Sequence, residues 1–283
     1  MSYKKPTKAV ITDAGFASRF LPITKTIPKA MMPMGAKPVM QLVVEECVAA
    51  GITDIIIVAT EEGKPIYEDY FGNPSERIRK LLTEQGKLDR FAPVEEVLEM
   101  ANVTVIVQDP ALPYGNGSPV VSAQPYLSED EAFIVLYSDD LVIGEGDVKT
   151  MLESYEQYPD AKAIIMAQEI PEEIWYRHGM IALKDKEKKT LSYIVEKPKT
   201  PAESPSGLTS YGRYLLTPEV FGYLVPKNTG LDNELWTVDA ITKLAEIGDV
   251  IVGKSRGVWL TTGDPANYFA ALTEYMKVMG GKK

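Results

Sequence analysis

Histidine and cysteine are scarce in this chain of 283 residues, in which each occurs once, as His178 and Cys47. A single cysteine cannot close a disulfide within the chain, and this favours a reducing compartment. One histidine is too few for zinc sites that rest on several histidines, and a Ser-His-Asp triad is not expected either. Any catalysis by this protein is therefore expected to rest on other side chains.

Long apolar runs and an excess of positive charge are also absent. No apolar run approaches the roughly 18 residues of a transmembrane helix, so we expect no membrane span. The first residues, MSYKKPTKAV, lack the apolar region of a signal peptide, and we expect a cytoplasmic protein. The 30 Lys and Arg against 40 Asp and Glu give a net charge of −10, which disfavours broad nucleic-acid binding. A small phosphorylated ligand held by a few local cations stays compatible with this balance.

Short apolar runs rich in valine and isoleucine are the most regular feature that is present. They cover residues 8–12, 54–60, 103–108, 132–138 and 161–168. Continuous apolar strands of this kind are typical of a sheet covered on both faces. Helical patterns separate them at 38–51, at 75–100 with breaks near Gly86 and Pro93, and at 146–158. This alternation predicts an α/β fold with a doubly wound, Rossmann-like, mostly parallel mixed sheet.

The texture of the chain changes after residue 168, and a C-terminal extension of sheet and helix is expected there. The patterns predict a hairpin over 179–199, a strand and then a helix over 209–225, and helices over 233–248 and 264–280. Asp264 is the expected N-cap of the last helix, with Pro265 at its first position. We expect a single domain over 1–283, divided into a core at 1–168, a second part at 169–263 and the helix at 264–283.

The stretch from Lys8 to Gln41 is the first candidate for chemistry. A strand followed by DAGFASR places backbone N–H groups and Arg19 beyond the carboxyl end of a strand, where doubly wound sheets bind ligands. The pattern matches neither the Walker A loop nor the dinucleotide-binding fingerprint. On the residues alone, a phosphate cradle and an ordinary loop with solvated cations both remain open.

The segment AGFASRFLPITKTIPKAMMPMGAKP, residues 14–38, resembles the signature G-x-G-T-R-x-x-P-x-T-x-x-x-P-K of the sugar-nucleotide pyrophosphorylases. The likeness runs along nearly the whole chain and includes VVEECVAAGITDIIIVAT, SDDLV, IVEKPK and GRYLLTPEVF. Within that family the chain is similar in particular to the bacterial UTP–glucose-1-phosphate uridylyltransferases. The resemblance implies a fold of the nucleotide-diphospho-sugar transferase type and the formation of UDP-glucose and pyrophosphate from UTP and glucose-1-phosphate. It also implies a Mg²⁺ cofactor and a homo-oligomer, either dimer or tetramer.

The resemblance also implies which residues are catalytic. Arg19 and Lys29 match the signature cations and would neutralise the triphosphate and the leaving pyrophosphate. Asp139 in YSDD would be the metal ligand, with Asp140 as its neighbour, because Mg²⁺ prefers hard oxygen ligands. Lys197 would pair with the phosphate of the sugar. A solvated turn at the end of a strand is the alternative for the aspartates.

The same resemblance assigns two further groups of binding residues, one in the core at 1–168 and one in the part at 169–263. The nucleotide would be bound by the core through Ala14, Gly15, Gln108, Gly115, Gly117 and Asp139. Gln108 offers both a donor and an acceptor to a pyrimidine, and the glycines permit close backbone approach. The sugar would be bound by Gly179, Glu196 and Lys197. A plain Pro/Gly turn is the alternative for residues 108–118.

Several positions depart from the family pattern, and they lie in the expected site. Ala17 stands at the second glycine of the signature, where a Cβ demands a different backbone angle or obstructs the phosphate. Asp13 places a negative charge near the expected triphosphate. Thr261 stands where the family carries an aspartate that is its second metal ligand, and a neutral hydroxyl is a poor replacement for a carboxylate on Mg²⁺.

Three hypotheses therefore remain open. The protein is an active uridylyltransferase that makes UDP-glucose, or an active relative that uses another sugar-1-phosphate, base or metal arrangement. The third hypothesis is a catalytically weakened paralogue that binds nucleotide or sugar and regulates a partner. The retained Arg19, Lys29, Asp139, Glu196 and Lys197 favour the first two hypotheses, whereas Thr261 favours the third.

Overall fold

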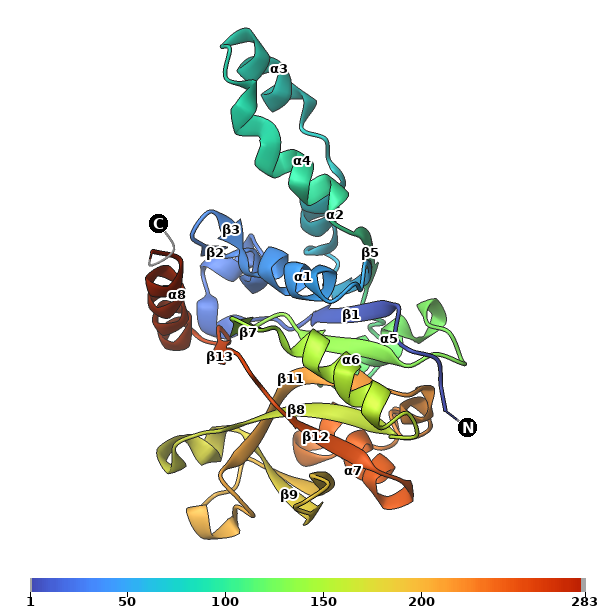
Figure 1. Cartoon of the computed structure of the whole chain (residues 1–283). Helices are drawn as coiled ribbons and strands as arrows, with labels where there is room; N and C mark the ends of the chain where they lie inside the picture. The colour runs from blue at the N-terminus through green and yellow to red at the C-terminus, as the bar shows by residue number, and fades with distance from the viewer. Residues whose placement is uncertain (1, 281–283) are drawn as a thin grey trace.

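The computed structural model describes residues 2–280, and a nine-stranded sheet forms its centre in the order β5-β4-β1-β6-β11-β8-β12-β10-β9 (Figure 1). Its strands are β1 (Lys8–Asp13), β4 (Asp54–Ala59), β5 (Asn102–Val107), β6 (Phe133–Tyr137), β8 (Ala163–Glu169), β9 (Gly179–Asp185), β10 (Thr190–Glu196), β11 (Leu208–Leu216) and β12 (Val250–Lys254). Two small sheets pair β2 (Pro33–Met34) with β3 (Lys37–Pro38), and β7 (Asp140–Ile143) with β13 (Val258–Thr261).

The sheet is mixed, as the sequence predicts. The strands β5, β4, β1 and β6 are parallel neighbours and form the Rossmann-like half. Strand β11 runs antiparallel to both of its neighbours, β6 and β8, while β12 lies parallel to β8. The predicted α/β class is therefore confirmed, with β11 inserted antiparallel at the middle of the sheet and β10 antiparallel to β12 and β9 near its edge.

Helices cover the sheet on both faces. They are α1 (Val39–Ala49), α2 (Lys64–Gly72), α3 (Glu76–Glu84), α4 (Ala92–Glu99), α5 (Gly117–Ala123), α6 (Asp147–Gln157), α7 (Thr237–Ile247) and α8 (Pro265–Gly280). On β1, Ala9 and Ile11 belong to the core beneath α1 and α6, whereas Val10 belongs to the core beneath α5 and α7. The alternation explains why the strand is apolar throughout, because both of its faces are buried. Cys47, on α1, is fully buried in the first of these cores.

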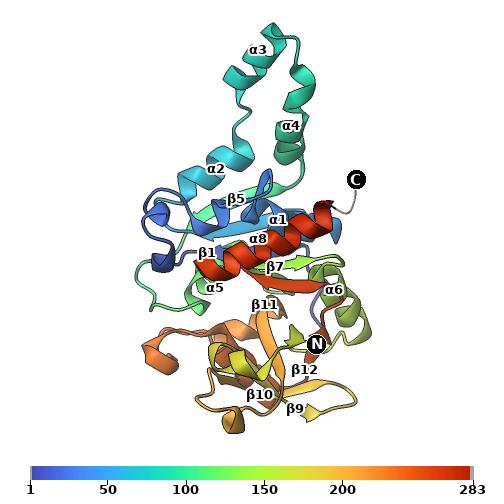
Figure 2. The ribbon, with the colours of Figure 1, turned by 90° about the vertical axis from the view of Figure 1, so that its left-hand side faces the viewer.

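The predicted helical segment at 75–100 forms an arm that projects from the body of the molecule (Figures 1 and 2). Helix α3 has no buried residue. Gly86, with φ of +67°, separates it from the 3-10 turn Leu88–Phe91 and from α4, so the predicted break is confirmed. Pro93 does not break the arm, because it lies in the first turn of α4, where a missing N–H costs no hydrogen bond.

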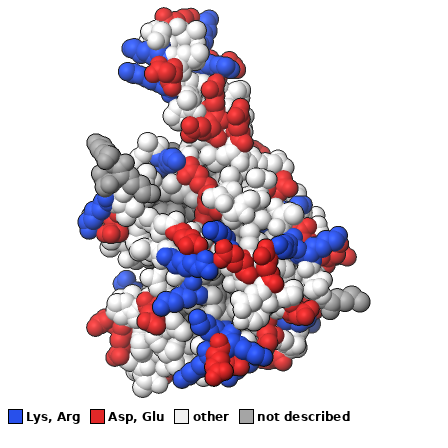
Figure 3. Space-filling view, in the orientation of Figure 1, with Lys and Arg blue, Asp and Glu red and all other residues white. Residues whose placement is uncertain are grey.

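Two predictions about the C-terminal half differ in outcome. The helix expected after Thr217 is only a 3-10 turn, Pro218–Gly222, so that prediction is wrong in length. The last helix is confirmed as α8, and Asp264 caps it by accepting a hydrogen bond of 3.0 Å from the backbone N–H of Asn267. None of the described helices is long and apolar enough to cross a membrane. Acidic and basic side chains are interspersed over the face shown in Figure 3.

Candidate active site

The carboxyl ends of the parallel strands gather the predicted residues at one edge of the sheet. Ala14 and Gly15 follow β1, Gln108 follows β5, and Asp139 comes just after β6. Because β5, β4, β1 and β6 are parallel, these strands end at the same edge. That edge is where open α/β sheets bind their ligands.

An ion pair between Lys29 and Asp139 lies at this edge. The Nζ of Lys29 donates a hydrogen bond of 2.6 Å to Oδ2 of Asp139, and the two side chains are 18% and 25% exposed. Lys29 opens the 3-10 turn Lys29–Met31 directly after Pro28, whose extended backbone turns the chain into it. Partial exposure leaves both charges accessible to a ligand.

The electrostatics of this pair favour its charged state. Burial alone raises the pKa of Asp139, but the charge and hydrogen bond of Lys29 outweigh it and leave the pKa lowered. Burial lowers the pKa of Lys29, but the charges of Asp139 and Asp13 outweigh it and leave the pKa raised. Both groups are therefore ionised at neutral pH.

Arg19 lies beside the same pair. It belongs to the 3-10 turn Ser18–Phe20, and its Nη1 donates a hydrogen bond of 3.5 Å to the carbonyl oxygen of Gly263. Its charge contributes to the lowered pKa of Asp139. Residues 19, 29 and 139 therefore come together, as the sequence predicts.

Asp13 is tolerated because its carboxylate is satisfied by neighbours. It accepts a hydrogen bond of 2.6 Å from the hydroxyl of Ser138 and another from the hydroxyl of Tyr67. Burial raises the pKa of Asp13, and the positive charge of Lys29 opposes this shift. The additional acid therefore contributes to the negative field around Lys29.

Thr261, at the end of β13, lies next to Asp139, as its place in the family pattern predicts. A Cβ at Gly263 would lie 3.1 Å from Oδ2 of Asp139 and 3.4 Å from Oγ1 of Thr261. The carboxylate of Asp139 and the hydroxyl of Thr261 therefore both lie close to Gly263. Asp264 does not replace the missing acid, because its two carboxylate oxygens bind Asn267. In residues 2–280 no group of three or more His, Cys, Asp or Glu side chains has the arrangement of a metal site.

Asp140 is turned away from this ion pair. Its carboxylate accepts hydrogen bonds of 2.7 Å from Nε1 of Trp259 and 2.9 Å from the N–H of Gly212, and the residue is buried. Burial, together with the charge of Asp139, raises the pKa of Asp140 to about 6. Asp140 is therefore not placed to bind a metal together with Asp139.

The predicted sugar-binding residues form a second group on the hairpin of β9 and β10. Gly179 pairs with Glu196 across the two strands, and a Cβ at position 179 would lie 2.8 Å from Oε2 of Glu196. Only glycine fits there without displacing this carboxylate. Burial raises the pKa of Glu196.

Lys197 extends this second group. Its backbone has φ of +50°, a strained angle for a residue with a side chain, and its N–H donates to the carbonyl oxygen of His178 at 3.1 Å. Its Nζ lies 3.9 Å from Oε1 of Glu196 and 4.9 Å from the centre of the Trp236 ring. The indole therefore holds the ammonium by a cation–π contact.

Trp259 connects the two groups. Its ring centroid lies 5.5 Å from that of His178, the residue before Gly179, while its Nε1 binds Asp140. Burial raises the pKa of Tyr137, the last residue of β6, and the charges of Asp140 and Glu196 add to this shift. The hairpin of β9 and β10 and the turn that carries Asp139 consequently lie in one region of the molecule.

The glycines of the predicted nucleotide segment lie against the backbone of Leu235. Gly115 has φ of +131°, and a Cβ there would collide with the carbonyl oxygen of Leu235. The N–H of Gly117 donates to the same oxygen at 2.8 Å. Close packing against residue 235 thus requires both glycines, whether or not a nucleotide binds there.

An aromatic contact joins this segment to the signature loop. The rings of Phe16 and Tyr114 are stacked, with centroids 6.1 Å apart, and both side chains are largely exposed. The loop that follows β1, with Ala14 and Gly15, therefore meets the loop that carries Gly115. Gln108 continues the sheet, because its N–H donates to the carbonyl oxygen of Ala59 at 3.0 Å.

Ala17 adopts the left-handed conformation, with φ of 46° and ψ of 40°. A Cβ in this region costs roughly 1–2 kcal/mol, whereas glycine adopts it freely. We therefore expect Ala17→Gly to raise the free energy of unfolding by about 0.5–1 kcal/mol, after the greater backbone entropy of glycine in the unfolded chain is subtracted. Urea unfolding measures this difference. Ala111→Gly is the matched control, since Ala111 has no positive φ, and a gain of equal size in both variants would refute the explanation.

Sequence reasoning did not identify the residues that hold the turn carrying Asp139 in place. They are Gly212, Arg213 and Trp259, which contact the turn at 137–140, and Glu46, which binds Arg213. These contacts join segments far apart in the chain. A hint was present in YGRY, because an arginine inside a strand that is otherwise apolar must find a buried partner. That partner is not identifiable from local sequence.

Comparison with known proteins establishes the class. A model of the nucleotidyl transferase family matches residues 8–278. With nearly the whole chain matched and the ion pair placed at the carboxyl edge of the sheet, the chain belongs to the nucleotidyl transferase family.

The relatives narrow the class further. The chain is 37% identical to UTP–glucose-1-phosphate uridylyltransferase 2 of Staphylococcus saprophyticus, across 96% of this chain and 92% of that protein. It is similar to a solved structure of UDP-glucose pyrophosphorylase complexed with UDP-glucose, with a TM-score of 0.81, 29% identity and coverage of 96% and 99% of the two chains. It is also similar to the UTP-bound enzyme of Acinetobacter baumannii, with a TM-score of 0.84, 30% identity and coverage of 95% and 93%.

Proposed function

We propose that this protein transfers the uridylyl group of UTP to glucose-1-phosphate and so forms UDP-glucose and pyrophosphate. The observation that carries this proposal is the Lys29–Asp139 ion pair at the carboxyl edge of the parallel strands, with Arg19 beside it. Relatives named for this reaction match nearly the full length of the chain. The proposed activity needs no histidine or cysteine, in agreement with the composition.

The reaction is an in-line displacement at the α-phosphorus of UTP. A phosphate oxygen of glucose-1-phosphate forms a bond to this phosphorus while the bond to the bridging oxygen breaks, and pyrophosphate leaves with the electron pair. Lys29 and Arg19 neutralise the triphosphate and the pyrophosphate, which gains charge as it leaves. Holding both substrates in line supplies the rest of the acceleration.

The sugar substrate is assigned to the hairpin of β9 and β10. Lys197 binds the phosphate of glucose-1-phosphate, and Glu196 accepts hydrogen bonds from sugar hydroxyls. Gly179 leaves room for the sugar to approach the backbone. The uridine is assigned to the other side, where Gln108 binds the base, and Ala14, Gly15, Gly115 and Gly117 border the nucleotide.

A magnesium ion fits the residues present. Asp139 is a partly exposed carboxylate beside the hydroxyl of Thr261, and Mg²⁺ is commonly bound by one or two carboxylates together with substrate phosphates and water. Asp139 would hold the ion. When bound, the ion supplies positive charge that stabilises the phosphate oxygens.

The same proposal extends to the organisation, location and assembly of the protein. Residues 1–168 serve the nucleotide and residues 169–263 the sugar, within one domain. The protein acts in the cytoplasm as a homo-oligomer, either dimer or tetramer. The exposed Phe269 and Met276 on α8 support an interface between copies, and light scattering of the purified protein measures its mass.

Release of pyrophosphate tests the activity. The purified chain is incubated with Mg²⁺, each nucleoside triphosphate and a panel of sugar-1-phosphates. Release with UTP and glucose-1-phosphate is expected. Release only with another pair would favour a relative with a changed substrate, and the proposed substrates would then be wrong.

A weakened paralogue that regulates a partner is the second candidate, and Thr261 is the observation that favours it. A neutral hydroxyl contributes less to metal binding than a carboxylate. Binding of UTP by calorimetry without turnover of any sugar-1-phosphate would support this candidate.

Thr261→Asp is expected to lower the Mg²⁺ concentration that gives half-maximal activity by about tenfold, because it adds a carboxylate beside Asp139. Activity titrated with Mg²⁺ measures the change. Thr261→Asn is the matched variant without the charge and is expected to leave the midpoint within about twofold of the unaltered protein. An unchanged midpoint in the aspartate variant would place residue 261 outside the metal site.

A further inference from the structure

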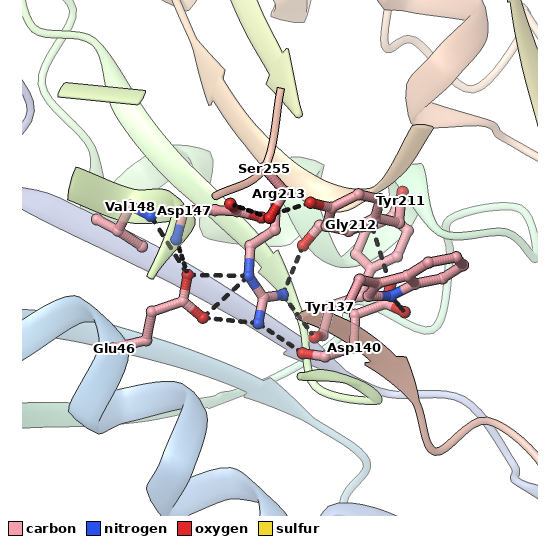
Figure 4. A network of polar contacts seen from close by, with 10 residues as sticks. Glu46, Tyr137, Asp140, Asp147, Val148, Tyr211, Gly212, Arg213 and Ser255 are labelled. Atoms are coloured by element: carbon pink, nitrogen blue, oxygen red, sulfur yellow. Dashed lines mark hydrogen bonds and ion pairs between the residues drawn. The ribbon is translucent and has the colours of Figure 1, made fainter. Parts of the chain in front are cut away.

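A fully buried arginine lies behind the turn that carries Asp139. Arg213, on β11, has no exposed surface, and its guanidinium pairs with Glu46, on α1, through hydrogen bonds of 3.1 Å from Nε and 2.8 Å from Nη2 to Oε2 (Figure 4). Removing two charges from water is costly, and an apolar pair of similar size is often at least as stable. A contribution to stability therefore does not by itself explain why this ion pair is buried here.

Arg213 also donates hydrogen bonds to the turn itself, while its Nη1 donates in addition to the carbonyl oxygen of Gly212 at 2.8 Å. Nη2 donates to the carbonyl oxygen of Asp140 at 2.5 Å, and Nη1 donates to that of Tyr137 at 3.3 Å. These two carbonyls bracket Ser138 and Asp139 on either side. A planar, rigid guanidinium bonded to both ends fixes the backbone from which the Asp139 side chain projects.

Asp140 adds a second anchor to the same turn. Its carboxylate receives the indole N–H of Trp259 at 2.7 Å and the backbone N–H of Gly212 at 2.9 Å. Trp259 is itself held by stacking on Tyr211, with ring centroids 4.8 Å apart. The turn is consequently tied to β11 and to β13.

Glu46 connects this assembly to helix α6. Its Oε1 accepts hydrogen bonds from the N–H groups of Asp147 at 2.9 Å and Val148 at 3.2 Å, which belong to the first turn of that helix. These N–H groups have no partner within the helix, and a carboxylate is a favourable acceptor there. One carboxylate thus joins Arg213 to two helices.

We propose that Arg213, Glu46, Asp140 and Trp259 are positioning residues, which hold Asp139 at the place where it meets Lys29 and a divalent cation bound with the nucleotide. The inference rests on the proposed function. None of the four is assigned a contact with substrate, and they act only through the backbone of residues 137–140 and the carboxylate of Asp140.

Trp259→Phe is the test, because it removes one hydrogen bond to Asp140 and keeps an aromatic ring against Tyr211. The probe is Mn²⁺ in the presence of UTP, followed by electron paramagnetic resonance. We expect the dissociation constant of Mn²⁺ to rise about tenfold and kcat to fall by a similar factor, as is typical for partners of metal ligands. The KM for glucose-1-phosphate is expected to stay within about twofold, since a phenyl ring still faces His178 and the contacts of Lys197 with Glu196 and Trp236 are unaltered.

Trp175→Phe is the matched control. Its indole also donates one hydrogen bond, of 3.0 Å, but to the carbonyl oxygen of Ile170, outside the assembly. We expect it to leave the Mn²⁺ dissociation constant and kcat unchanged. A Trp259→Phe protein that binds Mn²⁺ as tightly as the unaltered chain would overturn the inference, and so would an equal loss in the control.

Arg213→Lys is a second variant that keeps the charge and loses the rigid fork. It is expected to weaken Mn²⁺ binding at least as much as Trp259→Phe, and undiminished Mn²⁺ affinity in a folded Arg213→Lys protein would contradict the proposal. Failure of the proposed function has a different signature, because the unaltered chain would then show neither UTP-dependent Mn²⁺ binding nor release of pyrophosphate.

Discussion

Replacing Asp139 with asparagine is expected to lower kcat with UTP and glucose-1-phosphate by about 10³-fold. The substitution keeps the shape of the side chain and removes the charge that faces Lys29 at 2.6 Å. Loss of a group that holds and neutralises charge in the transition state is worth several kcal/mol, and each 1.36 kcal/mol corresponds to a factor of about ten. Steady-state release of pyrophosphate measures the effect.

Asp130→Asn provides the matched control. Asp130 also forms an ion pair with a lysine, Lys4, at 2.6 Å, but both side chains are largely exposed. Surface pairs of this kind contribute little to stability, and activity is expected to be unchanged. A rate for Asp139→Asn within about tenfold of the unaltered protein would show that the reacting phosphorus lies elsewhere.

Replacing Lys197 with methionine is expected to lower kcat/KM for glucose-1-phosphate by about 10- to 100-fold, the range that corresponds to a charged hydrogen bond of about 1.5–3 kcal/mol. The strained backbone of this residue, with φ of +50°, and the contact with Trp236 indicate that its ammonium is held in place before the substrate arrives. Dependence of the rate on glucose-1-phosphate concentration measures the loss. The affinity for UTP is expected to change little.

Lys199→Met is the control for this substitution, since Lys199 lies two residues further along the chain and is exposed. It is expected to leave kcat/KM unaltered. Equal losses in both lysine variants would indicate a general effect of surface charge on the approach of an anionic substrate, and Lys197 would then have no particular role.

The sequence predicts well the strands and the edge of the sheet at which the candidate site lies. The apolar runs at residues 8–12, 54–60, 103–108, 132–138 and 161–168 correspond to β1, β4, β5, β6 and β8. Their local composition is sufficient, because a strand buried on both faces must be apolar throughout. The cap of α8 is likewise a local signal, carried by Asp264 and the residues that follow it.

Long-range pairing is the part that the sequence does not predict. The position of β11 between β6 and β8, antiparallel to both, depends on contacts between distant segments. Local patterns also leave β12 and β13 unpredicted, and β13 matters because it brings Trp259 and Thr261 to the turn at 139–140. The element after Thr217 is shorter than the expected helix, because it is a 3-10 turn that begins at Pro218 and ends at Gly222.

The candidate site also has a part that the sequence predicts and a part that it does not. Arg19, Lys29 and Asp139 come together as the resemblance implies, and so do Gly179, Glu196 and Lys197. The sequence could not show that Asp140 points away, nor that Arg213 pairs with Glu46, which lies 167 positions earlier. Ligand contacts of these residues, and of the segment with Gly115, stay predictions.

A crystal structure of the protein with UTP and Mn²⁺ tests the central claim most directly, since Mn²⁺ gives an anomalous signal. The expected result is a peak bonded to the Asp139 carboxylate, with triphosphate oxygens within hydrogen-bonding distance of Lys29 and Arg19. A nucleotide bound away from these three side chains, or a peak coordinated by other residues, would contradict the proposed site and leave only the family and the fold.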